Sequence, residues 1–346
     1  MEQVVSPPKA RVDPDLTVSL GLSTLPLNQF RPNSKARDRI VNFLVISGGI
    51  GDYICYFQGI RWVAATYPHI IGRIYVSEHM LELTQQFFKE FPRWEVRDRA
   101  IINEAFLKAR PTFAPLLQPI NATGAHPLDL GFIYYANVNP PPKDWNEYPR
   151  IDLSALEGLK CEKPYAVMTP GATTENRTMR AEAFNGIKDH LIARGITPIF
   201  LGKKQITDVR QIRYESGYNF EGGLDLREQT SLLQAAGIMS KATLVVGLDN
   251  GLLHLAACTD VPIIFGYNIA SPEHRRPRRK VGDIWEIYPD VKELPCTFCQ
   301  SRMRYMFDHD FALCLYKDNA CLDALADPKP WCDAVDDVLA KTSKVE

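Results

Sequence analysis

The stretch LVVGLDNGLLHLAACTDVPIIFG, residues 244–266, decides the fold class of this chain. It predicts a buried strand over 243–246, a short helix over 251–258 and a second buried strand over 261–265. A strand, a helix and another strand form the unit from which parallel sheets with right-handed crossovers are built. The stretch therefore predicts an α/β fold.

Strands and helices alternate in two separate series along the chain. The segment 111–148 separates them, is rich in proline, and includes PPP at 140–142, which is typical of a linker. Two such series predict two Rossmann-like, doubly wound domains that face each other across a cleft. The predicted strands lie at 41–47, 72–76, 165–169, 197–201, 243–246 and 261–265, and the helices at 52–67, 78–90, 181–194, 230–240 and 251–258.

The chain divides into four parts on this basis. Residues 1–40 are predicted to be an arm broken by prolines, and 41–150 to be the first domain. The second domain is expected at 151–270. Residues 271–346 are expected to form a cysteine-rich module with a closing helix.

Composition indicates an ordinary globular protein. Hydrophobic residues make up 45% of the chain and charged residues 23%. A chain of 346 residues is long enough for two domains and can bury a sizeable hydrophobic core. The formal charge of -1 gives no global attraction to nucleic acid or anionic membrane. No apolar run is long enough to span a membrane, and the N-terminus lacks the pattern of a signal peptide. We therefore expect a cytoplasmic protein whose eight cysteines are free or metal-bound.

A glycine-rich turn, GGIGD at 48–52, follows the first predicted strand. Gly48, Gly49 and Gly51 permit a sharp turn and let a ligand approach the backbone. Asp52 then stands at the start of a helix, where it is either an N-cap or a group that points into the cleft. A dinucleotide-binding pattern needs a further glycine where Ile54 stands, which weakens the hypothesis of an NAD-dependent oxidoreductase.

A second turn, Asp249-Asn250-Gly251, joins a strand to a helix with His254 in its first turn. Free backbone N–H groups and the helix dipole at such a turn attract anions. Gly251 leaves room for a phosphate, and His254 can add a hydrogen bond to it. The alternative is an ordinary capped helix with a core histidine.

Four cysteines near the C-terminus have the spacing C-x2-C-x14-C-x6-C. Four thiolates in a closed tetrahedral site suit Zn or Fe. The alternative is a loop-rich module with reduced cysteines. The residues are Cys296, Cys299, Cys314 and Cys321.

A basic run, HRRPRRK at 274–280, precedes the cysteines. Such a run is most often a solvated loop. The alternative is that the run binds an anionic acceptor or nucleic acid. The net charge of the whole chain, close to zero, disfavours nucleic acid.

Three segments resemble the ADP-heptose:lipopolysaccharide heptosyltransferases, glycosyltransferase family 9. They are FLVISGGIGDYICYFQGIRWVAATYP at 43–68, PGATTENRTMRAEAFNGIKDHLIARG at 170–195, and the segment 225–266 that contains the Asp249 turn. The resemblance implies a GT-B fold, with the acceptor on the first domain and a nucleotide-sugar, ADP-heptose above all, on the second. Two departures put the exact donor in question: Met179-Arg180 replaces tryptophan-proline, and Asn250 replaces a small hydroxyl residue.

The resemblance also implies roles for single residues. Asp52 falls on the catalytic base, with Gly48, Gly49 and Gly51 as the acceptor-side loop. Arg177 falls where a lysine usually contacts the donor phosphates. The donor-binding residues expected in all are Gly171, Arg177, Lys203, Asp249, Asn250, Gly251 and His254.

The chemistry of sugar transfer fits these residue types. A base must accept the proton of the acceptor hydroxyl, and positive charge must stabilise the leaving diphosphate. The two Asp-x-Asp patterns, at 13–15 and 308–310, are badly placed for a catalytic metal, so we expect metal-independent transfer. The alternative in another class is a non-catalytic nucleotide-sugar-binding or scaffold protein of the same fold.

The cysteine segment, residues 296–325, resembles the C-terminal cysteine finger of bacterial autotransporter heptosyltransferases. That resemblance implies a structural Fe or Zn ion on the four cysteines, a homo-oligomer, and a protein hydroxyl as acceptor, with a glycan as the other choice.

Overall fold

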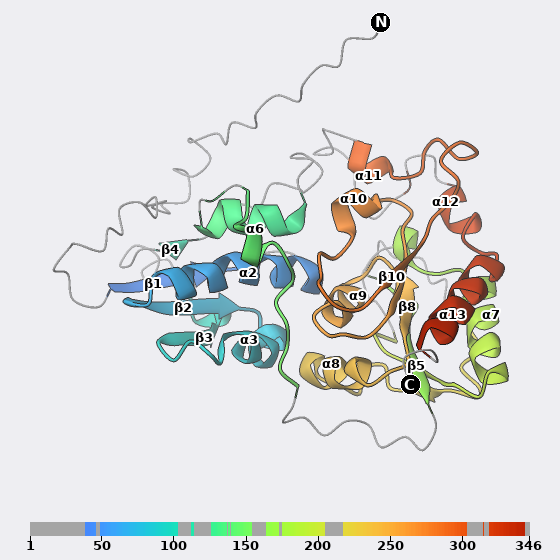
Figure 1. Ribbon diagram of the computed structural model, residues 1–346, viewed down its shortest axis with the longest axis horizontal. Helices are drawn as coiled ribbons and strands as arrows, with labels where there is room; N and C mark the ends of the chain where they lie inside the picture. Colours follow the sequence, from blue (N-terminus) through green and yellow to red (C-terminus); the bar gives the residue numbers. More distant parts are fainter. Residues whose placement is uncertain are drawn as a thin grey trace, which may run out of the picture.

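The computed structural model describes residues 39–45, 49–102, 112–113, 126–136, 138, 140–153, 164–172, 175–204, 217–302, 314 and 318–342. Two parallel sheets organise these residues, and Figure 1 shows them side by side with helices packed against each. The arm predicted at 1–40 lies outside the described residues, apart from its last two positions, which begin the first strand.

The first sheet has the strand order β3-β2-β1-β4 with every pair parallel. Its strands are β1 (Arg39–Leu44), β2 (Ile70–Val76), β3 (Trp94–Asp98) and β4 (Thr112–Phe113). Its helices are α2 (Ile50–Thr66), α3 (Leu81–Phe88) and α6 (Pro127–Ala136), with short 3-10 turns at η2 (Glu78–Met80), η3 (Arg99–Ile101) and η4 (Lys143–Trp145). Strands β3 and β4 and helix α6 are additions to the predicted elements.

Helix α6 lies against α2, and glycines set the distance between them. A Cβ on Gly59 of α2 would stand 2.4 Å from the carbonyl oxygen of Gly131, and a Cβ on Gly131 would stand 2.5 Å from that of Cys55. The backbones therefore touch where the helices cross. The sequence PLDLGFIYYA has no polar stripe because α6 is buried on most sides, and a helix without a stripe gives no periodic signal.

The second sheet has the order β10-β9-β8-β5-β6-β7, again all parallel. Figure 1 shows α8 and α9 on the side that faces the first domain, and α7 and α13 on the outer side. The strands are β5 (Tyr165–Thr169), β6 (Thr197–Phe200), β7 (Leu224–Asp225), β8 (Val245–Leu248), β9 (Ile263–Gly266) and β10 (Ile284–Ile287). The helices are α7 (Ala181–Ala193), α8 (Leu232–Ser240), α9 (Gly251–Ala256), α10 (Pro272–Arg275), α11 (Cys299–Arg302), α12 (Ala320–Asp323) and α13 (Lys329–Thr342), with a 3-10 turn at η5 (Glu175–Arg177).

The predicted boundary at 270 falls inside the second sheet. Strand β10 pairs with β9 beyond that point, and α13 packs its buried Trp331 near Gly266 of β9. The closing helix is confirmed, but it covers the outer face of the second sheet and so belongs to that domain.

Ligands bind parallel sheets where the strand order reverses, beyond the carboxyl ends of the strands. In the first sheet this point lies between β1 and β4, and in the second between β8 and β5. Asp52 follows β1 and Asp249 follows β8. Helices α2 and α9, which start at these two points, pack against each other, and one apolar core runs through both domains. The fold thus brings the two predicted turns together.

The basic run 274–280 is not a solvated loop, and we call it the arginine clasp. Arg278 makes a bidentate ion pair with Asp129 of α6, at 2.5 and 2.9 Å. Arg279 donates to the carbonyl oxygens of Thr259 and Val261. The solvated-loop interpretation was wrong because Arg278 ties the run to the first domain and Arg279 ties it to its own domain.

His126, just before α6, is the buried contact of the clasp. The backbone N–H of Leu128 donates to its Nδ1 at 3.1 Å, so Nε2 carries the proton and donates to the carbonyl oxygen of Arg276 at 3.0 Å. Burial, with the charge of Arg278, lowers the pKa of His126 from 6.5 to about 3. The folded protein therefore holds this imidazole neutral.

We expect a pH-dependent stability from this histidine. Its folded pKa lies below its unfolded value, so its contribution is complete above pH 6.5 and is lost as the pH falls toward 3. Between pH 7 and pH 5 the free energy of unfolding should fall by about 2 kcal/mol on this account. Denaturant unfolding of the parent and of His126→Gln, whose amide cannot titrate, measures the difference. Equal losses in both proteins would contradict the assignment.

Candidate active site

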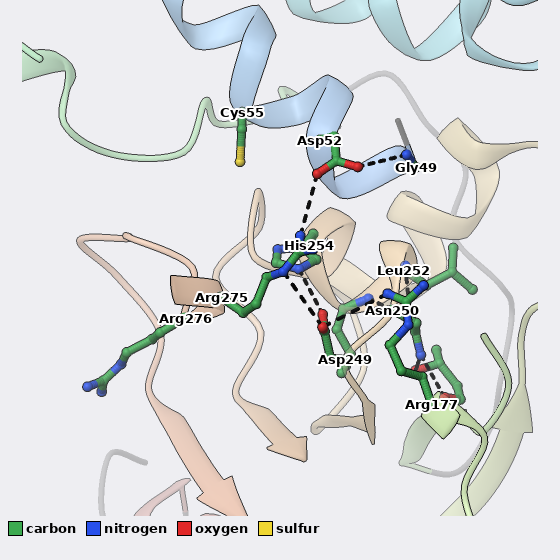
Figure 2. Close-up of polar contacts among 12 residues, drawn as sticks. Gly49, Asp52, Cys55, Arg177, Asp249, Asn250, Leu252, His254, Arg275 and Arg276 are labelled. Carbon is green, nitrogen blue, oxygen red and sulfur yellow. Dashed lines mark hydrogen bonds and ion pairs between the residues drawn. The ribbon is translucent and has the colours of Figure 1, made fainter. Parts of the chain in front are cut away.

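Asp52 stands in the first turn of α2 and uses its two oxygens differently. The backbone N–H of Gly49 donates to Oδ2 at 2.9 Å, which caps the helix. Oδ1 lies 3.4 Å from Nη1 of Arg275, across the domain boundary (Figure 2). The N-cap itself is Gly49, so the prediction of Asp52 as an N-cap was wrong: Asp52 stands three residues later and completes a capping box with one oxygen, while the other faces the second domain. Gly48 lies outside the described residues.

Gly51 and Gly251 lie where the first turns of α2 and α9 meet. A Cβ on Gly51 would stand 2.7 Å from the ring of His254, and one on Gly251 would stand 2.8 Å from Ile50. Both glycines are therefore needed for the close approach of the two helices. At Gly251 the neighbour in this structure is Ile50, where we expected space for a phosphate.

Asn250 is the N-cap of α9. Its Oδ1 accepts from the backbone N–H groups of Leu252 and Leu253 at 2.9 and 3.1 Å, and its Nδ2 donates to the carbonyl oxygen of Thr169 at 2.9 Å. Two of the N–H groups that we expected to bind an anion are thus used by Asn250 itself. The side chain also ties the end of β5 to the start of α9, across the reversal point of the sheet.

His254 connects three elements through a buried chain of hydrogen bonds. Its Nε2 lies 3.3 Å from Oδ1 of Asp249, and its Nδ1 lies 2.8 Å from the hydroxyl of Tyr148. The thiol of Cys55 donates to that hydroxyl at 3.2 Å. With the thiol and the phenol both donating toward His254, its Nδ1 accepts and its Nε2–H donates to the carboxylate. Both ring nitrogens are engaged, so His254 orients Asp249, whereas we expected it to bind phosphate.

Asp249 is the buried acid of the group, at 2% exposure. Burial opposes its charge, but the hydrogen bond from His254 and the charges of Arg275 and Arg177 hold the pKa of this carboxyl well below its usual range. Its Oδ2 lies 3.9 Å from Arg177 and 3.9 Å from Arg275, and it accepts no hydrogen bond from the part of the chain that is described. Figure 2 shows both guanidinium groups near Asp249.

The two arginines differ in their balance of burial and charge. Burial lowers the pKa of Arg177, and Asp249 opposes that only in part. For Arg275, Asp249 and Asp52 together outweigh burial and raise its pKa. Both side chains stay positive, so two cations and two carboxylates meet at the domain boundary.

The remaining donor-binding candidates lie farther along the sheet edge. Gly171 follows β5 and is partly buried. Lys203 follows β6 and is exposed, close enough to His79 of the first domain to lower the pKa of that imidazole together with burial. Lys203 is therefore exposed and apart from the main group of predicted site residues. The structure brings together, where the two domains meet, Asp52, Arg177, Asp249, Asn250, Gly251 and His254.

The four cysteines line one small cavity of about 20 Å³, together with Asn176 and Asp318. Asn268 donates to Cys321 at 3.7 Å, and Cys314 donates to Asp318 at 3.7 Å. Within the described ranges, which omit 303–313 and 315–317, no three Cys, His, Asp or Glu side chains are close enough to bind a metal ion.

Hydropathy adds one more finding. None of the helices in the described part of the chain is both long and apolar enough to cross a membrane.

Comparison with known proteins gives a consistent result. Residues 135–301 match the model of glycosyltransferase family 9 (heptosyltransferase). Family and fold together support a glycosyltransferase. No curated protein sequence matches the chain.

Solved structures share the fold at low sequence identity. The iron-containing dodecameric glycosyltransferase TibC from enterotoxigenic E. coli H10407 has a TM-score of 0.68 and 16% identity over 89% of this chain and 78% of that one. A family 9 glycosyl transferase from Veillonella parvula has a TM-score of 0.58 and 13% identity, over 88% and 97% of the two chains. E. coli ADP-heptose lps heptosyltransferase II has a TM-score of 0.57 and 14% identity, over 88% and 99%.

These structures agree with the predicted α/β fold with parallel sheets. Sequence reasoning missed two of the site residues, Arg275 and Tyr148. Arg275 was one of several arginines in the run 274–280, and the order of residues does not say which one turns inward. Tyr148 lay in the proline-rich joint, and no pattern pairs it with His254.

Proposed function

We propose that the chain transfers a heptose from ADP-heptose to a hydroxyl group, without a catalytic metal and with Asp52 as the base. One observation carries this proposal. A carboxylate oxygen of the first domain lies opposite an arginine pair and a buried acid of the second, at the points where both parallel sheets reverse their strand order. A base on one side and positive charge on the other is what sugar transfer needs.

The reaction assigns each group a task. Oδ1 of Asp52 accepts the proton of the acceptor hydroxyl, whose oxygen bonds to the anomeric carbon of the donor sugar. The bond from that carbon to the diphosphate oxygen breaks, and the diphosphate leaves with the electron pair. Arg177 offsets the charge that develops there. Asp249, oriented by His254, holds Arg177 in the site.

The donor is proposed from likeness and from charge. A structure of TibC, which shares this fold with a TM-score of 0.67, contains ADP-D-beta-D-heptose. The acceptor is proposed to be a protein serine or a glycan, and the place of reaction the cytoplasm. Gly171, Lys203, Asn250 and Gly251 are proposed to line the donor side, with Gly49 and Gly51 on the acceptor side.

We also propose a structural Fe or Zn ion on Cys296, Cys299, Cys314 and Cys321. The four thiols line one cavity with room for a single ion, which fits this donor set. The ion would supply a crosslink between the segments that carry these cysteines. TibC is iron-containing and dodecameric, and a homo-oligomer is proposed here on the same likeness.

Nucleotide release tests the function. The full-length protein is incubated with ADP-heptose, and separately with ADP-, UDP- and GDP-linked hexoses, and free nucleoside diphosphate is measured. We expect slow hydrolysis of ADP-heptose above the other donors. Binding without release, seen as a donor-induced rise in melting temperature, would favour the scaffold alternative, and a response to NAD alone would favour the oxidoreductase.

A further inference from the structure

Arg275 is the one arginine of the clasp whose guanidinium lies between the two acids of the site. Nη1 is 3.4 Å from Oδ1 of Asp52, and Nε is 3.9 Å from Oδ2 of Asp249. Ideal charge-assisted hydrogen bonds between these groups measure about 2.8 Å. The guanidinium is therefore held near both carboxylates and bonded closely to neither.

The backbone that carries Arg275 is fixed, in contrast to its side chain. The backbone N–H groups of Arg275 and Arg276 donate to the carbonyl oxygens of Ser271 and Pro272 at 3.0 and 2.7 Å, and Arg278, three residues after Arg275, is bound to Asp129. The side chain is only 16% exposed and stands at the domain boundary. A fixed backbone with a loosely bonded guanidinium is an arrangement in which only the side chain needs to move.

The charges of the site indicate which kind of ligand would draw the Arg275 guanidinium away from Asp52 and Asp249. Asp52, Asp249, Arg177 and Arg275 sum to zero, so the site without a ligand is neutral. A nucleoside diphosphate brings two to three negative charges with no cation of its own. The planar fork of a guanidinium binds phosphate oxygens through two N–H groups, which its long contacts to the carboxylates do not use well.

We propose that Arg275 is a second donor-phosphate ligand, held between Asp52 and Asp249 until the diphosphate binds. This rests on the proposed function. The diphosphate takes the guanidinium from Asp52, and Oδ1 of Asp52 then has no cationic partner and can accept a proton. Donor binding therefore precedes activation of the base.

Ligand affinity tests the proposal. Binding of ADP, and of adenosine as the phosphate-free comparison, is measured by calorimetry for the parent, Arg275→Gln and Arg275→Lys. Loss of a charged hydrogen-bonding partner should weaken ADP binding by about 10- to 100-fold in Arg275→Gln. Adenosine binding should stay unchanged. Arg275→Lys, which keeps the charge without the fork, should lie between the two and guards against a glutamine variant that fails to fold.

Arg276→Gln is the matched control. Figure 2 shows Arg276 pointing away from the site, and its side chain pairs with Glu286. It should bind ADP like the parent. If Arg275→Gln also binds ADP like the parent, or loses adenosine equally, the assignment of Arg275 fails while the function stands. If the parent itself binds no ADP, the proposed function and this inference fall together.

Discussion

Asp52→Asn should fold normally, bind the donor, and transfer sugar about 10²- to 10⁴-fold more slowly than the parent. The amide oxygen of asparagine can accept a hydrogen bond in the same place, so the bond from the N–H of Gly49 can be kept. The amide, however, cannot take the proton of the attacking hydroxyl. Stability, ADP affinity and transfer rate are measured on one preparation, so that the loss is assigned to chemistry.

A second aspartate offers a matched control. Asp98 is the last residue of β3 and the N-cap of η3, where it accepts a hydrogen bond from the backbone N–H of Ala100 at 2.9 Å. Asp98→Asn makes the same chemical change at a helix cap that has no proposed catalytic role. It should leave the transfer rate within a few-fold of the parent. If Asp52→Asn behaves in the same way, Asp52 is only a helix cap.

Cys299→Ser should lose the metal ion and much of the stability of the second domain. Binding energy of a structural metal is folding energy, and for zinc it reaches about 10 kcal/mol in small domains. Elemental analysis of the purified parent should find close to one Fe or Zn per chain. Thermal unfolding before and after chelation should show a lower midpoint for the metal-free protein.

Cys332→Ser is the control for that experiment. Cys332 lies on α13 and donates to the carbonyl oxygen of Gly186, outside the cavity that the other four line. It should keep the metal and the parental midpoint. A parent free of metal, or one whose stability ignores chelation, would sink the metal proposal.

Much of the site follows from the sequence because turns after parallel strands have a local signature. The glycines before Asp52 and the Asp249-Asn250-Gly251 turn each mark a strand that ends and a helix that begins, and topology then places both at the reversal points. Strands β5, β8 and β9 were predicted within about two residues for the same reason.

The missed features depend on contacts between distant parts of the chain. Helix α6 is apolar apart from Asp129 and buried on most sides, so its sequence has no hydrophobic period to detect. Arg275 contacts Asp52, which lies 223 residues earlier in the chain. The engagement of His254 by Tyr148 joins positions 106 residues apart. Local patterns contain none of this information.

The contact between Ile50 and Gly251 has a consequence for how this chain can be recombined. Each domain supplies one half of the contact, and a Cβ on Gly251 would reach within 2.8 Å of the isoleucine. A larger residue at 251 is tolerable only with a smaller one at 50, so the two positions are expected to vary as a pair. A chimera that joins the first domain of one relative to the second domain of another must therefore inherit both halves of the pair from one parent.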